Sequence, residues 1–326
     1  MKIIKPGLLT TIQDAGRNGW QRYGVVVGGV MDSLSFRIAN RLLGNPEGLA
    51  VLEITLQGPT IQFEEFTYCV LTGADLSPRL NCQTITLYRP FPVHPGDELS
   101  FNYPNIGCRT YLAVSGGFVV TEVLGSRSTY LRSAMGGYKG RKLQEGDRLQ
   151  TGTHEGMDQL CNFFQFSQTK RYPLVSQTLN PSYQTYRSIR FLPGPEWHLF
   201  NHDAQKQWQE QSFLVMPQSD RMGYRLQGPP IQLTKAEEML SSAVTMGTVQ
   251  VPSDGQPIIL MADRQTTGGY PRLAQIITAD LPVLAQVRPG DKLRFQLCSL
   301  EEARSALMEQ ERQLANLFWA LEWYKK

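Results

Sequence analysis

A segment typical of a buried strand runs directly into a polar loop, and this junction is the part of the sequence best suited to chemistry. Residues 256–262 (QPIILMA) are mostly apolar and include β-branched side chains. Residues 263–271 (DRQTTGGYP) then bring together a carboxylate, a guanidinium, an amide and hydroxyls around a Gly-Gly turn. Burying one unpaired polar group costs about 1–3 kcal/mol. The loop is therefore either a satisfied internal network or a functional site.

A second polar group lies in a glycine-rich segment near the N-terminus. Residues 10–17 (TTIQDAGR) are followed by several glycines between positions 19 and 29, and glycine lets a backbone approach a ligand closely. Asp14 could act as a base or orient a substrate, and Arg17 could bind a carboxylate or phosphate through two hydrogen bonds. The sequence leaves open the alternative of a turn held by an Asp14–Arg17 pair.

A third polar segment, residues 219–225 (SDRMGYR), places two guanidiniums and a phenol around one glycine. These groups could bind an anion and hydrogen-bond a carbonyl. The alternative is the exposed edge of a strand that carries charged side chains.

Other segments resemble ligand-binding motifs only in composition. Residues 125–129 (GSRST) and 136–141 (GGYKGR) are rich in glycine and basic residues, but neither matches the P-loop pattern or clearly opens a helix. His198 and His202 are four residues apart in a segment that we expect to be helical, without the acidic neighbour of a zinc-protease motif. We therefore expect neither a P-loop nor a metal site.

The elements that position these groups are mostly short strands. The strand candidates are rich in β-branched and aromatic residues and are bounded by Gly, Pro or Asp. Besides the segment before Asp263, they are residues 68–71, 84–88, 109–114, 188–192, 248–251 and 273–277. Many short strands with few helices favour barrels or sandwiches.

Two patterns occur once in each half of the chain, in the same order. Residues 56–63 (LQGPTIQF) recur as 226–233 (LQGPPIQL), and residues 95–101 (PGDELSF) recur as 289–295 (PGDKLRF). Residues 145–149 (EGDRL) are a weaker third copy of the second pattern. The repeats indicate a tandem duplication of one β unit, with Gly-Asp turns that lead into strands.

Three helices interrupt the strands. Asp32 or Ser33 can cap the first helix, which ends at Gly44, and the second covers residues 197–211. The third begins at Ser299 with the spacing of a capping box. Its leucines recur every seven residues, at Leu300, Leu307, Leu314 and Leu321. This pattern fits a helix packed on its own barrel or a coiled-coil-like contact with a partner or a second copy.

Composition excludes several classes of protein. The chain has 326 residues, 19% charged and 41% apolar, with a formal net charge of +3. This charge gives no reason to expect a nucleic-acid partner, and no apolar run reaches the roughly 20 residues that span a bilayer. The N-terminus lacks the features of a signal peptide, and the five cysteines form no C-x-x-C pair. We therefore expect a cytoplasmic protein with reduced thiols.

A set of motifs, taken together, resembles the KipA family, whose members are also described as the C subunit of 5-oxoprolinase, as allophanate hydrolase subunit 2-like or as biotin-dependent carboxyltransferase-like proteins. The similarity runs in order over residues 1–297. The motifs are TTIQDxGR at 10–17, MDxxSxRxAN at 31–40, LExTxxGP at 52–59, TGAD at 72–75, YLAVxGGF at 111–118, GSRSTY at 125–130, SDRMGYRL at 219–226 and MADRQTTGGYP at 261–271.

The resemblance implies a mainly β fold with two tandem cyclophilin-like β-barrel domains, a few short helices and a C-terminal helix. The expected N-terminal domain covers residues 1–166 and a linker covers residues 167–187. The C-terminal domain then covers residues 188–298, and the C-terminal helix covers residues 299–326.

The resemblance also implies an ATP-dependent 5-oxoprolinase, in which the C subunit works with the A and B subunits to convert 5-oxo-L-proline to L-glutamate. In this role the chain is a hydrolase subunit for a cyclic amide, inactive without its partners. One alternative is a carboxyltransferase that uses biotin carried on another protein. Another is a KipA-type regulator that binds and antagonises a KipI-like histidine kinase inhibitor.

The expected partners are a KipI-like B subunit, the A subunit of 5-oxoprolinase and a small-molecule substrate, with neither nucleic acid nor membrane. A homo-oligomer through the C-terminal helix is a further option. The expected cofactor is ATP, with or without magnesium, in a site on this chain or shared with a partner subunit. No covalent biotin is expected on this chain, because it has no Ala-Met-Lys-Met-type acceptor.

These hypotheses assign roles to the polar residues. Carboxylates could orient a substrate and a phenol could hydrogen-bond the lactam carbonyl, whereas guanidiniums could bind a carboxylate or phosphoryl group. The catalytic candidates are Asp14, Asp32, Tyr224 and Asp263. The candidates for binding substrate or phosphate are Arg17, Arg221, Arg225, Arg264, Gln265, Thr266 and Thr267. No metal ligand is assigned.

Overall fold

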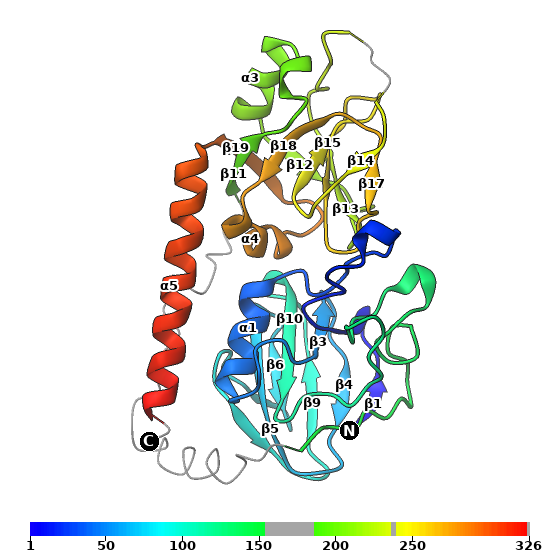
Figure 1. The fold of residues 1–326 in the computed structure, drawn as a ribbon. Helices are drawn as coiled ribbons and strands as arrows, with labels where there is room; N and C mark the ends of the chain where they lie inside the picture. The colour runs from blue at the N-terminus through cyan, green and yellow to red at the C-terminus, as the bar shows by residue number, and fades with distance from the viewer. Residues whose placement is uncertain (154–185, 236–238, 325–326) are drawn as a thin grey trace. The chain divides into compact units, whose positions relative to one another are not determined.

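The computed structural model describes residues 1–153, 186–235 and 239–324 (Figure 1). The chain divides into two compact units. Unit 1 comprises Met1–Gly16, Asp32–Ser182 and Glu311–Lys326, and unit 2 comprises Arg17–Met31 and Tyr183–Gln310. Strands dominate both units, with a few short helices and a long C-terminal helix, so the predicted mainly β class is confirmed.

The strands of unit 1 form two antiparallel sheets. The first has the order β1-β4-β9-β6-β7 and the second the order β2-β3-β10-β5-β8. The strands of the first sheet are β1 (Lys2–Lys5), β4 (Thr60–Gln62), β9 (Glu98–Phe101), β6 (Pro78–Leu80) and β7 (Gln83–Thr84). Those of the second are β2 (Leu9–Gln13), β3 (Val51–Thr55), β10 (Ile106–Val114), β5 (Thr67–Asp75) and β8 (Phe91–Val93).

The alternation of side chains along β3 shows how the second sheet is used. Leu52 and Ile54 point into the hydrophobic core of unit 1, whereas Glu53 between them points to the opposite face. Helix α1 (Ser33–Leu42) contacts β5 and β10 of this sheet. It begins at the predicted cap, because the Asp32 side chain accepts a hydrogen bond from the Ser35 backbone N–H.

Unit 2 is built on a closed barrel. Its strand order is β11-β18-β15-β16-β13-β12-β19, and β19 closes the ring because it pairs with both β12 and β11. The strands are β11 (Tyr186–Pro193), β18 (Arg272–Ile276), β15 (Thr248–Gln250), β16 (Ile258–Leu260), β13 (Gly223–Gln227), β12 (Phe213–Val215) and β19 (Lys292–Leu297). A separate two-stranded ribbon pairs β14 (Ser242–Ala243) with β17 (Thr267–Gly268).

The helix predicted over residues 197–211 is interrupted. A 3-10 turn, η3 (Trp197–Leu199), is followed by α3 (His202–Glu210). The backbone of Phe200 is extended, and the Asn201 side chain accepts a hydrogen bond from the Ala204 N–H. This cap begins a new helix. His198 and His202 therefore do not share one helix. Trp208 of α3 reaches the core, where its ring stacks on Phe295 at 3.8 Å between centroids.

The prediction of a strand over residues 84–88 was wrong except at Thr84. Only Thr84 belongs to β7, and Tyr88 has a left-handed backbone with φ of 58°. The Tyr88 side chain is buried although the residue lies in a loop. Its hydroxyl accepts a hydrogen bond from the Gly73 N–H at 3.0 Å. The remaining short helices are η1 (Gln21–Tyr23), η2 (Leu131–Ser133), η4 (Thr278–Asp280) and α4 (Leu281–Ala285).

The three Gly-Asp turns found in the sequence have the same local structure. Gly96, Gly146 and Gly290 have φ angles of 94°, 82° and 93°, which favour glycine. In each turn the Asp side chain accepts a hydrogen bond from the backbone N–H three residues earlier. The donors are His94, Gln144 and Arg288, at 2.7 to 2.9 Å. The recurring Gly-Asp sequence therefore corresponds to one recurring turn structure.

Helix α5 (Leu300–Tyr324) begins with the predicted capping box. The Ser299 hydroxyl accepts from the Glu302 N–H at 3.1 Å, and the Glu302 carboxylate accepts from the Ser299 N–H at 2.7 Å. In unit 1, Leu314 and Leu321 of the leucine repeat are buried, whereas Leu300 in unit 2 is 73% exposed. Part of the repeat thus packs within the chain, and the homo-oligomer through α5 stays a prediction.

The predicted linker at residues 167–187 lies outside the described residues except for its last two, which already belong to β11. The four cysteines in the described part of the chain are free thiols, and Cys161 lies outside it. None of the described helices combines the length and apolar character needed to span a bilayer.

Candidate functional site

The loop after β16 is held next to the segment that precedes β13. The two strands are antiparallel neighbours, with Gly223 opposite Leu260. Their pairing continues past the strand ends, because the Met261 N–H donates to Met222 O at 2.9 Å and the Asp263 N–H donates to Arg221 O at 2.8 Å. Strand register therefore places the first polar residue of the loop beside the first arginine of the 219–225 segment.

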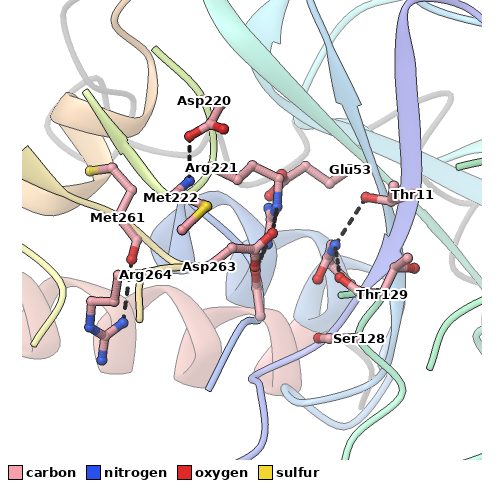
Figure 2. Close-up of polar contacts among 12 residues, drawn as sticks. Thr11, Glu53, Ser128, Thr129, Asp220, Arg221, Met222, Met261, Asp263 and Arg264 are labelled. Atoms are coloured by element: carbon pink, nitrogen blue, oxygen red, sulfur yellow. Dashed lines mark hydrogen bonds and ion pairs between the residues drawn. The ribbon is translucent and has the colours of Figure 1, made fainter. Parts of the chain in front are cut away.

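Arg221 and Asp263 form a two-point ion pair (Figure 2). Arg221 Nε donates to Asp263 Oδ2 and Arg221 Nη2 donates to Asp263 Oδ1, both at 2.9 Å. Arg221 Nη2 also donates to the Gly29 carbonyl at 2.6 Å. Both side chains are buried, where such a bidentate pair is geometrically specific.

Arg17 lies beside this pair. A Cβ atom built on Gly28 would stand 3.6 Å from both Arg17 Nη1 and Asp263 Oδ1, so the two groups meet at this glycine. Gly28 has φ of 66°, a conformation that favours glycine. Arg17 is fully buried, and its N–H donates to Val27 O at 2.7 Å. The Arg17 guanidinium and the Asp263 carboxylate therefore both lie next to Gly28 in unit 2.

Arg264 has a different environment. It is buried, and among the described residues its guanidinium contacts backbone carbonyls, with Nε 3.4 Å from Val244 O and Nη1 3.4 Å from Met261 O. Burial lowers its pKa from the usual value, although the neighbouring Asp263 raises it in part. The Gln21 amide donates to the same Val244 carbonyl at 3.0 Å and to Thr266 O at 3.2 Å.

The other predicted residues of unit 2 lie apart from this cluster. Tyr224 is 2% exposed and belongs to the hydrophobic core of the barrel. Arg225, its neighbour on β13, points the other way and is exposed. Gln265 and Thr267 are also exposed. The structure thus brings together Arg17, Arg221 and Asp263, with Arg264 next in sequence.

Asp14, in unit 1, is an internal anchor. Its carboxylate accepts four hydrogen bonds of 2.5 to 2.9 Å. The donors are the N–H groups of Gly16 and Arg127 and the hydroxyls of Ser126 and Ser128. The segment with the composition of a phosphate loop, residues 125–129, therefore binds a carboxylate of the same chain.

Asp32 is a helix cap. Its carboxylate accepts from the Ser35 N–H at 2.9 Å and from the Ser35 hydroxyl at 2.7 Å, and its own N–H donates to the Tyr111 hydroxyl at 2.8 Å. These contacts position α1 on the second sheet of unit 1.

Sequence reasoning missed a second buried polar cluster in unit 1. The Tyr111 hydroxyl donates to Glu53 Oε2 at 2.9 Å, and Arg109 Nε lies 3.9 Å from Glu53 Oε1. Burial, followed by the charges of Glu53 and Asp32, raises the pKa of Tyr111. An acid in the middle of the apolar strand β3 was the signal that could have found it.

Gln21 was also missed. It lies in the glycine-rich segment, but no pattern in the sequence joins it to Val244 or Thr266. In the described part of the chain, no group of three or more His, Cys, Asp or Glu side chains converges as metal ligands would.

Comparison with known proteins gives consistent matches over most of the chain. The family model described as carboxyltransferase domain, subdomain A and B, matches residues 23–297. The C subunit of 5-oxoprolinase from Escherichia coli is 42% identical over 98% of this chain and 98% of its own length. The C subunit of 5-oxoprolinase from Haemophilus influenzae is 42% identical over 90% of this chain and 89% of its own length.

A solved structure matches as well. The crystal structure of the K. lactis urea amidolyase has a TM-score of 0.87 and 31% identity, and it covers 97% of this chain. This chain corresponds to only 20% of that protein.

Proposed function

Because the chain belongs to the carboxyltransferase domain family, subdomains A and B, we propose that it is the C subunit of an ATP-dependent 5-oxoprolinase. The observation that carries the proposal is the match to relatives that are named as this subunit. In the E. coli case the match extends over 98% of both chains.

The proposed reaction is the opening of 5-oxo-L-proline, a cyclic amide, to L-glutamate. ATP supplies the driving force: transfer of its terminal phosphoryl group to the lactam oxygen releases ADP and activates the ring carbon for attack by water. Phosphate then leaves, and cleavage of the ring C–N bond gives the carboxylate and amine of glutamate. The residues of this chain contribute positive charge near such oxygens, through buried guanidiniums in unit 2. The Arg221–Asp263 pair holds that region of the barrel in place.

The arrangement of unit 2 supports anion binding better than proton transfer. Asp263 is engaged at both oxygens by Arg221, and Tyr224 lies in the core. In unit 1, Asp14 and Asp32 are occupied as an anchor and a cap. We therefore propose that a partner supplies groups for the chemical step and that the chain is inactive alone.

The proposed partners are the A subunit of 5-oxoprolinase and a KipI-like B subunit, in the cytoplasm. The relatives are named as one lettered subunit of an enzyme, and this naming implies that other subunits exist.

A second candidate function is carboxyl transfer to or from biotin carried on another protein. The observation that favours it is the family model itself, together with the fold match to the urea amidolyase structure. In that case turnover would require bicarbonate and a biotinylated protein, whereas the 5-oxoprolinase reaction requires neither.

The proposal is tested by co-expressing the chain with the A and B subunits and purifying the complex. Addition of 5-oxoproline and ATP should release glutamate and ADP together, without added biotin or bicarbonate. A correctly assembled complex that releases neither product would refute the proposal. Release that depends on a biotinylated protein would favour the carboxyltransferase instead.

A further inference from the structure

Arg264 is a buried cation of unit 2 for which the described residues provide no paired carboxylate. Its side chain is 8% exposed. Its two hydrogen bonds, to the Val244 and Met261 carbonyls, are both 3.4 Å long, beyond the usual range of 2.7–3.2 Å. Within the described ranges no carboxylate forms an ion pair with it, and the adjacent Asp263 is paired with Arg221.

A buried cation without a carboxylate is costly to the folded protein, and buried charges are normally paired. The contrast with other arginines of the same unit is clear. Arg272 binds both oxygens of Glu196, at 2.8 and 2.6 Å, and Arg190 binds both oxygens of Asp280. A buried guanidinium without such a carboxylate partner is suited to bind the anionic group of a ligand.

Hydrogen bonds hold the backbone around Arg264 in place. The Val244 carbonyl accepts hydrogen bonds from both Arg264 and Gln21, and Gln21 also holds the Thr266 carbonyl. This amide thus ties the η1 turn to the segments that flank the β14–β17 ribbon. The guanidinium is thus held by two long contacts to backbone carbonyls and not by a carboxylate of the described residues.

We propose that Arg264 is the receptor for the anionic group, a carboxylate or a phosphate, of a small-molecule ligand of unit 2. The planar guanidinium can donate two parallel hydrogen bonds to either group. The proposal rests on the 5-oxoprolinase assignment only for the identity of the carboxylate ligand, 5-oxoproline.

Calorimetric titration of the full chain separates the two sources of the anion. The ligands are 5-oxoproline, 2-pyrrolidinone, which is the same ring without the carboxylate, and inorganic phosphate. We expect 5-oxoproline to bind at least about 10-fold more tightly than 2-pyrrolidinone if the carboxylate is the recognised group. Binding of phosphate but not of 5-oxoproline would assign the site to a phosphate. Binding of neither anion would overturn the proposal.

Three variants locate the site. Arg264→Gln should weaken anion binding about 10- to 100-fold. Arg264→Lys, which keeps the charge and is the milder change, should retain part of the affinity because it loses only the two-point geometry. Arg294→Gln, at an exposed arginine of β19, should bind as the wild type does. Unchanged affinity in both Arg264 variants would overturn the proposal.

Stability distinguishes a ligand receptor from a structural arginine. Arg264→Met removes a buried charge that has no carboxylate partner among the described residues, so its melting temperature without ligand should equal or exceed that of the wild type. A marked decrease would show that the arginine stabilises the fold and would contradict the proposal.

Activity of the assembled complex separates the two proposals. If the complex binds the anion but releases no glutamate, the 5-oxoprolinase assignment is refuted and the anion receptor is not. If the complex that contains Arg264→Gln turns over with an unchanged KM for 5-oxoproline and for ATP, the proposed role of Arg264 is refuted and the 5-oxoprolinase assignment is not.

Discussion

Arg221 and Asp263 face each other across the end of the β13–β16 pair and share two hydrogen bonds of 2.9 Å. Their backbones are also bonded, since the Asp263 N–H donates to Arg221 O at 2.8 Å. The ion pair therefore continues the ladder of two barrel strands and fixes the start of the polar loop. This arrangement makes Asp263 a positioning group for the loop.

Replacing Asp263 by Ala should lower the free energy of unfolding by about 3 kcal/mol, because it removes one partner of a buried ion pair. Chemical denaturation of the full chain measures the loss. Glu210→Gln is the matched control: its carboxylate is exposed and pairs with Lys206 only at 4.0 Å, so the change should stay below about 0.5 kcal/mol. Equal stability of Asp263→Ala and the wild type would contradict the anchoring role.

Replacing Asp14 by Ala should release the loop of residues 125–129. The carboxylate accepts hydrogen bonds from Ser126, Arg127 and Ser128, and bonds to a charged group contribute about 1.5–3 kcal/mol each. Hydrogen exchange should become faster at the Arg127 amide. Asp14→Asn, which keeps one acceptor oxygen, should have a smaller effect. Unaltered exchange in Asp14→Ala would show that the loop is held by other contacts.

The pair of Glu196 and Arg272 should make stability depend on pH in the acid range. Hydrogen bonds from the Arg272 guanidinium hold the pKa of Glu196 below its usual 4.5, although burial opposes this. Because the folded pKa lies below the unfolded one, the stabilisation is fully present above about pH 4.5 and is lost as the pH falls through the folded pKa.

Unfolding of the wild type and of Glu196→Gln between about pH 3 and pH 7 measures this contribution. The difference between the two proteins should be largest at neutral pH and should shrink as the solution becomes more acid. A difference that does not vary with pH would contradict the assignment.

The leucine repeat of α5 allows a test with two similar residues. Leu314 is 1% exposed and Leu300 is 73% exposed. Leu314→Ala should lower the free energy of unfolding by about 2–5 kcal/mol, whereas Leu300→Ala should have almost no effect. Thermal unfolding, together with the mass of the particle in solution, checks both. A change in oligomeric state with Leu300→Ala would instead support the coiled-coil interpretation.

Local patterns predicted much of the fold because they depend on neighbouring residues. Asp32 caps α1 and Ser299 caps α5 as expected from side-chain chemistry alone. The interruption of the helix at Phe200 was not predicted, although the Asn201 side chain that caps the second helix is a local signal. The loop position of Tyr88 was not predicted either, because its hydroxyl bonds the Gly73 N–H, which is distant in sequence.

The candidate site was predicted in part for a similar reason. Arg17, Arg221 and Asp263 were identified by residue type. Strand register, which the sequence does not reveal, joins Arg221 to Asp263, and the backbone around Gly28 brings Arg17 next to Asp263. Tyr224 and Arg225 were candidates from the same motif as Arg221. The alternation of β13 sends one to solvent and the other to the core.

In the proposed function this chain is a required component of a 5-oxoprolinase. The most direct measurement is the rate of glutamate release from 5-oxoproline and ATP by the purified A and B subunits, with and without this chain. Glutamate should be released only when the chain is present, in proportion to the amount of complex formed. An equal rate without the chain, or no release from a fully assembled complex, would contradict it.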